Sequence, residues 1–393
     1  MAEIRETVAR KPMIVVGTAA WNAPWLTEQN LAFSLARNHP MLYVEPPEIP
    51  LRRGAGGTPR LRRERREGRE IIIFRPLVLP LRSRGASVRM SAPLYRVQLG
   101  ALTRRIGFEG AMILSGDARP GFLGAAGECL SSYIVKDWIY EDADLVGRSA
   151  GDLLVERDGI CSSVDIVLAI SPRLQTSLAA AGIRAQLLRH GFHADLTDEY
   201  LHGPPAEYAG LPAPRIVFAG RVDGRLDIDR LRSLAQRLEG GSIVLIGPTS
   251  PRMPSDDLHA LRDEPNIHLL GARERRRLPP YLAHADCLLI PYRDTVWAEH
   301  GSPLKLWDYL YAGPPIVGSG YTVLRDFEPL IRYVAGDGGE FADAVLAAVA
   351  DPSGAQERRA LALRNTWDAR ARELEGIFDR VLAERRAAGS VAS

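Results

Sequence analysis

Residues 301–319 read GSPLKLWDYLYAGPPIVGS and contain Lys305, one of three lysines among the fifty basic residues of the chain. Because arginine occupies almost every other cationic position, a lysine retained here indicates a need for a compact ammonium group. Ser302 suits the N-cap of a helix, Pro303 the first helical position and Gly313 a left-handed C-cap. The stretch therefore predicts a helix of about ten residues that is followed by a buried strand.

The start of this predicted helix suits a phosphate group. Lys305 falls in the first turn, beside unpaired backbone N–H groups and the positive end of the helix dipole. Asp308 follows three residues later on the same face and could accept hydrogen bonds from ribose hydroxyls. The other sides are apolar and predict a mostly buried helix. A capped helix with one lysine reaching to solvent is the alternative interpretation.

Working outward, short apolar runs alternate with amphipathic stretches along the whole chain, which is typical of parallel sheets covered by helices. The sequence predicts strands at 13–17, 41–45, 71–75, 111–115, 133–136, 165–171, 215–220, 242–247, 266–271, 286–291 and 315–319. This pattern predicts an α/β protein made of two doubly wound domains.

The chain length of 393 residues also suits two domains. We expect a first domain over 1–195, a Pro- and Gly-rich linker over 196–213 and a second domain over 214–370. A C-terminal helix over 371–393 is expected to pack back on the first domain. Because ligands of open α/β sheets bind at the carboxyl ends of the strands, we expect an active site in a cleft between the domains.

Composition narrows the class of protein. Hydrophobic residues make up 46% and charged residues 25% of the chain, as in a globular enzyme. The cysteines Cys129, Cys161 and Cys287 have no metal-binding spacing, which favours packed thiols in a reducing cytoplasm. Charges interrupt the first twelve residues, and no apolar run reaches the roughly 18 residues of a membrane span, so neither a signal peptide nor a transmembrane helix is predicted.

Positive charge is concentrated between residues 50 and 105, a segment that contains 15 arginines and 3 glutamates. Such a segment could contact anionic lipid headgroups, an acidic acceptor or nucleic acid. A solvated loop is the alternative. Nucleic acid is disfavoured because no aromatic interleaving accompanies the arginines. We therefore expect a cytoplasmic protein, with peripheral contact of this segment with an anionic membrane as the alternative to a solvated loop.

The second half contains IHLLGARERRRLPPYLAHADCLLIPYR (267–293) followed by SPLKLWDYLYAGPPIVGS (302–319). The order of elements in these two runs resembles the donor domain of GT-B glycosyltransferases, in particular the large retaining group called family 4. LLRHGF (187–192) resembles the turn before the interdomain linker. The run at 16–47 resembles the glycine loop and first helix of related acceptor domains. The resemblance implies two Rossmann-like domains that face a central cleft.

The resemblance further implies transfer of a sugar from a nucleotide-diphosphate donor such as a UDP-sugar, without a bound metal. Lysine, arginine and a helix N-terminus would neutralise the leaving diphosphate. Arg221 matches the phosphate-contacting arginine, Lys305 its partner and Asp308 the ribose-binding acid, although the family usually has glutamate there. Asp227 stands where the family has a second lysine, and Arg225 is the nearest substitute. The remaining expected donor contacts are Gly220, Tyr292, Ser302, Pro303 and Leu304.

The catalytic assignment is less direct. The family pairs its ribose-binding acid with a carboxylate eight residues earlier, which here falls on His300, next to Glu299. Either Glu299 or His300 is therefore the candidate to contact the donor sugar, and a one-residue shift in the loop decides which. In retaining enzymes of this fold the departing phosphate helps to deprotonate the acceptor. An inverting enzyme would use a general base, for which Asp137 is the candidate. A solvated loop aspartate is the alternative for Asp137. The expected acceptor contacts are Gly17, Trp21, Trp25 and Trp138, whose aromatic rings could equally be packing residues.

Two pairs of aspartates, Asp142/Asp144 and Asp227/Asp229, have a spacing that binds metal in another glycosyltransferase fold. Neither closes a predicted strand, so we interpret both as helix-start or surface acids and predict no metal site.

The expected acceptor is a small molecule or a lipid-linked molecule. A sugar-nucleotide epimerase and a non-catalytic nucleotide-sugar binding protein remain alternatives on the same scaffold. The arginine-rich composition suits a high-GC bacterium, where such enzymes serve polysaccharide or natural product biosynthesis.

Overall fold

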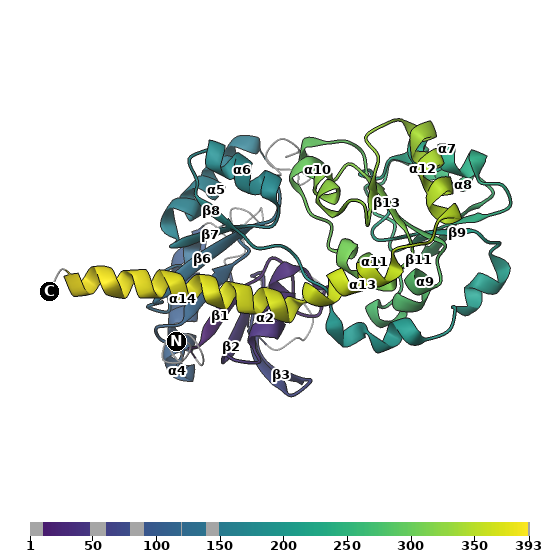
Figure 1. Ribbon diagram of the computed structural model, residues 1–393. Helices are drawn as coiled ribbons and strands as arrows, with labels where there is room; N and C mark the ends of the chain where they lie inside the picture. Colours follow the sequence, from purple (N-terminus) through teal and green to yellow (C-terminus); the bar gives the residue numbers. More distant parts are fainter. Residues whose placement is uncertain (1–10, 48–59, 79–89, 119, 139–148, 392–393) are drawn as a thin grey trace. The chain divides into compact units, whose positions relative to one another are not determined.

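The computed structural model describes residues 11–47, 60–78, 90–118, 120–138 and 149–391 (Figure 1). The chain divides into two compact units. Unit 1 contains residues 1–189 and 367–393, and unit 2 contains residues 190–366. Within the described part of the chain, no helix is both long and apolar enough to cross a membrane.

Unit 1 is built on an eight-stranded sheet with the order β3-β4-β2-β1-β5-β6-β7-β8. All neighbouring strands run parallel except β3 and β4, which form an antiparallel hairpin at one edge. The inner strands are buried on both faces, as parallel strands covered by helices must be. The strands are β1 (Met13–Val16), β2 (Met41–Val44), β3 (Leu61–Arg66), β4 (Arg69–Phe74), β5 (Met112–Ser115), β6 (Leu130–Val135), β7 (Ile166–Ala169) and β8 (Ala185–Leu187).

The helices of unit 1 include the end of the chain. They are α2 (Thr27–Leu35), α4 (Ala92–Ile106), α5 (Ala150–Ser163), α6 (Pro172–Ala180) and α14 (Trp367–Val391). Helix α14 packs against α2 (Figure 1). Glu375 of α14 accepts a hydrogen bond from Asn38 at 3.0 Å and contacts the His39 ring at 3.1 Å. The C-terminal helix therefore belongs to unit 1 although it follows unit 2 in the sequence.

Unit 2 is built on a six-stranded parallel sheet with the order β11-β10-β9-β12-β13-β14. Its strands are β9 (Arg215–Ala219), β10 (Ser242–Ile246), β11 (Ile267–Gly271), β12 (Cys287–Pro291), β13 (Ile316–Ser319) and β14 (Arg332–Tyr333). Its helices are α7 (Ile228–Arg237), α8 (Ser255–Arg262), α9 (Pro279–Ala283), α10 (Val296–His300), α11 (Lys305–Ala312), α12 (Gly338–Ala350) and α13 (Ala355–Arg364). The expectation of two doubly wound α/β domains is confirmed.

The division between the units differs from the expected boundaries. Residues 196–213, expected as a linker, contain short 3-10 helices that are part of unit 2. Tyr200 and Tyr208 are buried there, and the Tyr208 hydroxyl donates to the backbone oxygen of Tyr281 at 2.7 Å. Aromatic side chains thus pack a segment whose proline and glycine content suggests an extended connection.

Each of the eleven expected strands is present, and the described residues contain three further strands, β3, β8 and β14, each at an edge of its sheet. Strand β3 has a polar sequence, and it pairs with β4 through the two-residue turn Glu67-Gly68. Both turn residues have positive φ, 51° and 74°, which is typical of the tight turns that join antiparallel strands. Strands β8 and β14 are too short for an alternating pattern to show in the sequence.

Candidate functional site

The carboxyl ends of the central strands mark the point in each unit where strand order reverses. In unit 2 the chain runs outward from β9 through β10 and β11, then returns to β12 on the other side of β9. In unit 1 it runs from β1 through β2 to the hairpin and returns to β5. Ligands of doubly wound sheets bind at such switch points. Polar side chains at these strand ends are therefore candidates for a ligand site.

Lys305 lies at the switch point of unit 2. Its Nζ donates to the Tyr292 hydroxyl at 2.9 Å and lies 3.8 Å from the centre of the Phe218 ring. A Cβ atom built on Gly220 would stand 2.3 Å from this Nζ. Phe218 belongs to the end of β9, Gly220 directly follows that strand, and Tyr292 follows β12. The ammonium group of α11 is therefore held between the ends of the two strands at which the order reverses, with glycine leaving the room it needs.

The surroundings of Lys305 disfavour its charged form. Burial lowers the pKa of Lys305 well below its ordinary value, and the neighbouring Arg225 lowers the pKa further, while Asp223 partly offsets both effects. A cation that is destabilised in this way gains from a nearby anion. Lys305 is thus poised to bind a negatively charged ligand at the end of the sheet.

Two arginines after β9 occupy different environments. Arg221 is exposed, and it makes no ion pair with any residue that the structure describes. Arg225 is held by Asp223 through bonds of 2.7 to 3.1 Å, and its guanidinium lies 4.9 Å from the centre of the Trp297 ring. Arg221 is therefore available to a ligand, whereas the charge of Arg225 is already balanced.

The start of α11 differs from the expected cap. The helix runs from Lys305 to Ala312 with Leu304 as the N-cap residue, and no side chain caps it. The preceding turn instead closes through Leu306 N–H to the Pro303 carbonyl at 3.1 Å. Ser302 therefore lies before this turn and does not cap the helix, while Lys305 remains in the first turn as expected.

The Asp308 carboxylate lies near His193 and Tyr200. Burial lowers the pKa of His193, and the carboxylates of Asp195 and Asp308 act in the opposite direction. Burial also raises the pKa of Tyr200, with Asp308 acting in the same direction. The Asp308 Oδ1 atom is buried and has no hydrogen-bond partner among the described residues. The structure thus places the carboxylate near His193 and Tyr200 with an unused acceptor atom.

The two residues expected to contact the donor sugar lie on the short helix α10. Thr295 caps this helix by accepting from Ala298 N–H at 3.1 Å. Glu299 is half-buried, whereas His300 is 4% exposed and its Nδ1 lies 2.7 Å from the Val296 carbonyl oxygen. Of this pair, Glu299 has the more accessible side chain.

A second group of polar side chains lies at the switch point of unit 1. Glu28, in the first turn of α2, is fully buried and forms an ion pair with Lys136, which follows β6. The Thr18 hydroxyl after β1 donates to Glu28 Oε1 at 2.9 Å and accepts from Lys136 Nζ at 2.9 Å. The Glu28 carboxylate packs so tightly on Gly116, after β5, that a Cβ there would stand 1.8 Å from Oε1.

This group was not among the residues predicted for the site. Lys136 is the second of the three lysines, so the scarcity that singles out Lys305 could have singled it out too. Its partner Glu28 lies 108 residues earlier, and nothing in the sequence links the two. Two of the three lysines therefore stand at the switch points of the two sheets.

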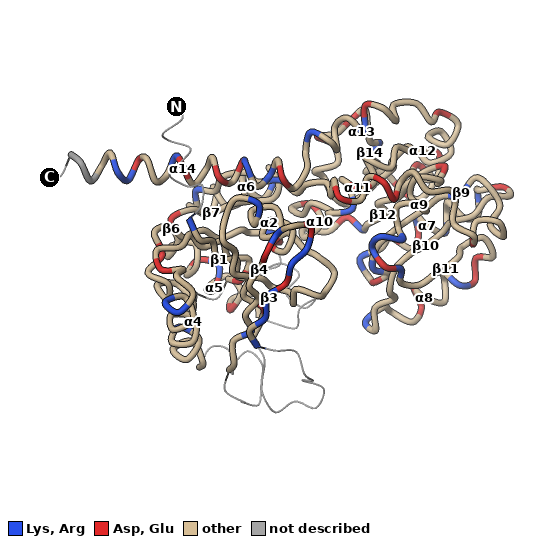
Figure 2. The backbone as a smooth tube through the Cα atoms, turned by 90° about the horizontal axis from the view of Figure 1, so that it is seen from below, with Lys and Arg blue, Asp and Glu red and all other residues tan. Residues whose placement is uncertain are grey.

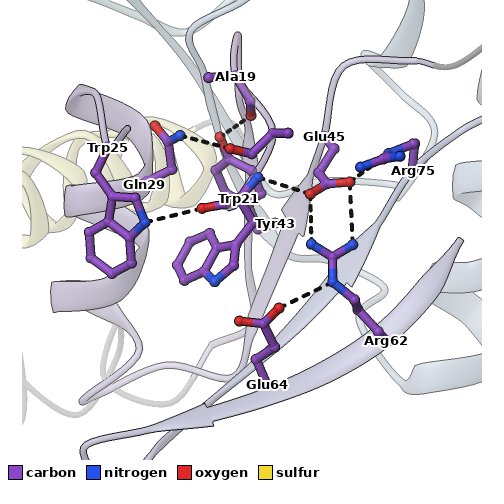
Figure 3. A network of polar contacts seen from close by, with 10 residues as sticks. Ala19, Trp21, Trp25, Gln29, Tyr43, Glu45, Arg62, Glu64 and Arg75 are labelled. Carbon is purple, nitrogen blue, oxygen red and sulfur yellow. Dashed lines mark hydrogen bonds and ion pairs between the residues drawn. The ribbon is translucent and has the colours of Figure 1, made fainter. Parts of the chain in front are cut away.

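The loop between β1 and α2 is held by a buried polar network (Figure 3). Glu45, after β2, accepts from Trp21 N–H at 2.9 Å, from Arg62 at 2.8 Å and from Arg75 at 2.7 Å. Burial alone would raise the pKa of Glu45, but these hydrogen bonds hold it below its ordinary value. The Tyr43 hydroxyl donates to the Ala19 carbonyl at 2.8 Å. The network fixes the backbone at the end of β1.

Three of the expected acceptor contacts have structural roles in this loop. Trp21 is 3% exposed and packs against Trp25 and Tyr43, so its ring is not available as an acceptor wall. Trp25 is half-buried and lies under the Arg66 guanidinium at 4.7 Å. A Cβ on Gly17 would stand 1.8 Å from the Tyr43 hydroxyl, so glycine is needed there for packing.

The remaining candidates of unit 1 follow β6. Asp137 and Trp138 are half-buried, and the Arg157 guanidinium lies 5.3 Å from the centre of the Trp138 ring. Asp142 and Asp144 lie outside the described residues. Asp227, of the other pair, is the N-cap of α7 and accepts from Arg230 N–H at 3.0 Å. Among the residues described, no cluster of three or more His, Cys, Asp or Glu could hold a metal ion.

The match to a known family lies in the second unit, and the similarity to solved structures extends over almost the whole chain. Residues 213–351 match the family described as Glycosyl transferases group 1. A curated Bacillus subtilis (strain 168) protein named as a teichuronic acid biosynthesis glycosyltransferase, TuaH, is 25% identical over 122 residues. The match spans 30% of each of the two chains, so the chain covers less than a third of this curated relative.

Solved structures resemble almost the entire chain. Sucrose-phosphate synthase from Thermosynechococcus elongatus has a TM-score of 0.72 at 18% identity, with 95% of this chain and 100% of that chain covered. HepE from Anabaena, solved in complex with UDP and glucose, has a TM-score of 0.63 at 14% identity, with 94% and 99% covered. At these identities the likeness shows the fold. The fold is GT-B, as expected. Within the second unit, residues 213–351 match the group 1 glycosyltransferase family.

Proposed function

We propose that the protein is a glycosyltransferase that moves a sugar from a nucleotide-diphosphate donor to a hydroxyl group of an acceptor. The observation that carries the proposal is the position of Lys305, whose ammonium group lies between the ends of β9 and β12 beside the start of α11. In a domain that matches group 1 glycosyltransferases, this is the place where a donor diphosphate would be neutralised.

Donor binding is proposed to need no metal. Lys305, the unpaired Arg221 and the N–H groups at the start of α11 together supply the positive charge that a metal would otherwise provide. Asp308, with its unused Oδ1, would accept from a ribose hydroxyl. The complex of the similar HepE structure with UDP and glucose favours UDP as the nucleotide part of the donor.

The reaction is proposed to proceed with retention. The bond between the sugar C1 and the diphosphate oxygen breaks, a bond from C1 to the acceptor oxygen forms, and the hydroxyl proton passes to the departing phosphate. Glu299 is the candidate to stabilise positive charge on the sugar, and His300 supports the helix that carries it. Inversion with Asp137 as general base is the alternative.

The acceptor is proposed to bind unit 1, and it is a small molecule or a lipid-linked one. The ion pair of Glu28 with Lys136 presents no net charge at the switch point, which suits a hydroxylated acceptor there. A cytoplasmic location and contact of the arginine-rich segment with an anionic membrane are part of this proposal, since both fit a lipid-linked acceptor.

Donor consumption in solution tests the proposal. The purified protein is incubated with UDP-glucose and with matching ADP-, GDP- and TDP-sugars, with EDTA present, and NMR of the anomeric protons is recorded together with nucleoside diphosphate release. We expect one donor to release its diphosphate, slowly with water as the acceptor. Interconversion of sugar isomers without release would favour an epimerase, and binding without turnover would favour a non-catalytic protein.

A further inference from the structure

The arginine-rich segment contains two kinds of arginine. Those of the β3–β4 hairpin are engaged within unit 1. Their contacts are Arg62 with Glu45 and Glu64, Arg63 and Arg65 with Glu70, Arg66 with the Trp25 ring, and Arg69 with the Phe33 carbonyl and ring. These contacts hold the hairpin arginines against groups of unit 1, with Arg63 and Arg65 sharing one glutamate.

The arginines of helix α4 are not engaged in this way. Three arginines of this helix are exposed: Arg96, Arg104 and Arg105. Their guanidinium groups form no ion pair or hydrogen bond within the part of the chain that the structure describes. Helix α4 contains no aspartate or glutamate. Figure 2 marks the basic positions of the helix along the backbone. Among the described residues of the segment, α4 thus carries positive charge that no acidic side chain balances.

The same helix exposes an apolar stripe. Leu94, Val97 and Ala101 follow each other at intervals of three and four residues, which places them on one face of the helix. Val97 is 67% exposed, and Met90, just before the helix, is 66% exposed. The opposite face, with Tyr95, Leu99 and Leu102, is buried against unit 1. The exposed stripe is therefore not required for the core.

Helical periodicity sets Arg104 and Arg105 on either side of this stripe. At 3.6 residues per turn, the position of Arg104 falls to one side of the line through Val97 and Ala101, and that of Arg105 falls to the other. Apolar side chains flanked by arginines are the arrangement with which a helix lies in the interface of a membrane.

We propose that the face of α4 formed by Met90, Leu94, Val97, Ala101, Arg104 and Arg105 docks on an anionic lipid surface. The apolar side chains enter the boundary between headgroups and acyl chains, and the two arginines contact lipid phosphates. The role that we give to this contact, which is to bring unit 1 to a lipid-linked acceptor, rests on the proposed function. Lipid binding itself requires neither donor nor acceptor.

Sedimentation with lipid vesicles tests the proposal. The full chain is mixed with vesicles of phosphatidylglycerol and phosphatidylcholine in equal parts, or with phosphatidylcholine alone. We expect binding to the anionic vesicles that weakens as salt is raised. Arg104→Gln with Arg105→Gln should weaken binding about 25-fold, since each arginine near an anionic surface contributes about fivefold. Met90→Ser with Val97→Ser should weaken it by about tenfold.

Matched variants show whether lipid binding depends on this face of α4 or only on the overall charge and hydrophobicity of the protein. Arg184→Gln with Arg262→Gln removes two exposed arginines elsewhere, and Val155→Ser with Leu201→Ser removes two exposed apolar residues elsewhere. Both should bind vesicles like the unmodified protein, and all variants should keep the melting temperature of the unmodified protein.

Absence of binding to anionic vesicles, or equal losses of binding in the matched variants, would overturn the proposal. A face that instead mediates self-association, seen as a change of oligomeric state in the α4 variants without vesicle binding, would also overturn it. None of these three results would affect the test of donor turnover.

Discussion

Substitution of Lys136 by methionine should destabilise the protein by about 3–5 kcal/mol, the usual effect of breaking a buried ion pair by removing one partner. Glu28 is fully buried, and Lys136 is the cation that compensates its charge. Without the ammonium group, the carboxylate would keep only the Thr18 hydroxyl at Oε1, because Oε2 has no hydrogen-bond partner among the described residues. Urea denaturation followed by circular dichroism measures the loss.

Two further variants test whether this loss comes from the ion pair. Lys11→Met removes the third lysine, which forms no side-chain ion pair with the described residues, and it should change stability by less than about 0.5 kcal/mol. Glu28→Gln combined with Lys136→Met removes both charges and should recover most of the stability. If Lys136→Met were no more destabilising than Lys11→Met, the buried pair would not have the role assigned to it.

Substitution of Lys305 by methionine should weaken binding of the donor diphosphate by about 10- to 100-fold, the range for loss of a hydrogen bond to a charged group. Stability should change little or rise, because the site disfavours the charged lysine and a methionine can pack against Phe218. Calorimetric titration with UDP and thermal unfolding measure the two quantities. Arg262→Gln, an exposed arginine on α8, is the control and should alter neither.

Donor binding should also depend on pH through Lys305. In the free protein the pKa of Lys305 lies well below its ordinary value, so the amine loses its proton at a lower pH than a solvated lysine does. A bound diphosphate favours the protonated form, so binding is coupled to proton uptake. Affinity should therefore fall as pH rises through the lowered pKa, and Lys305→Met should abolish this dependence. Equal affinity of both proteins at every pH would show that Lys305 does not contact the ligand.

The inner strands of both sheets were predictable because they are buried on both faces and read as continuous apolar runs. Strand β3 was not, since its residues Leu61–Arg66 are mostly charged and its pairing depends on a turn and on Glu45. The position of Lys305 followed from helix signals and from the scarcity of lysine. The first turn of α11 nevertheless closes through the Pro303 backbone, a detail that capping preferences do not determine.

The contacts of the candidate site in unit 1 could not be predicted from the local sequence. Trp21 is a large aromatic residue after a strand, which suggests a ligand contact, yet its neighbours Trp25 and Tyr43 bury it. Glu28 and Lys136 meet across more than a hundred residues, and only the order of the strands brings them together. Residue type and local spacing indicate local structure, whereas these long-range contacts depend on the topology.

The most direct test of the central claim, that unit 2 binds a nucleoside diphosphate around Lys305 without metal, is a thermal-shift panel with UDP, GDP, TDP, ADP and CDP in EDTA. A ligand that binds only the native state raises the midpoint of unfolding. We predict that one diphosphate, with UDP favoured, raises the unfolding midpoint of the unmodified protein. In Lys305→Met most of this shift should be lost, while the midpoint without ligand should change little or rise. Absence of stabilisation by all five diphosphates, or an unchanged shift in Lys305→Met, would contradict the claim.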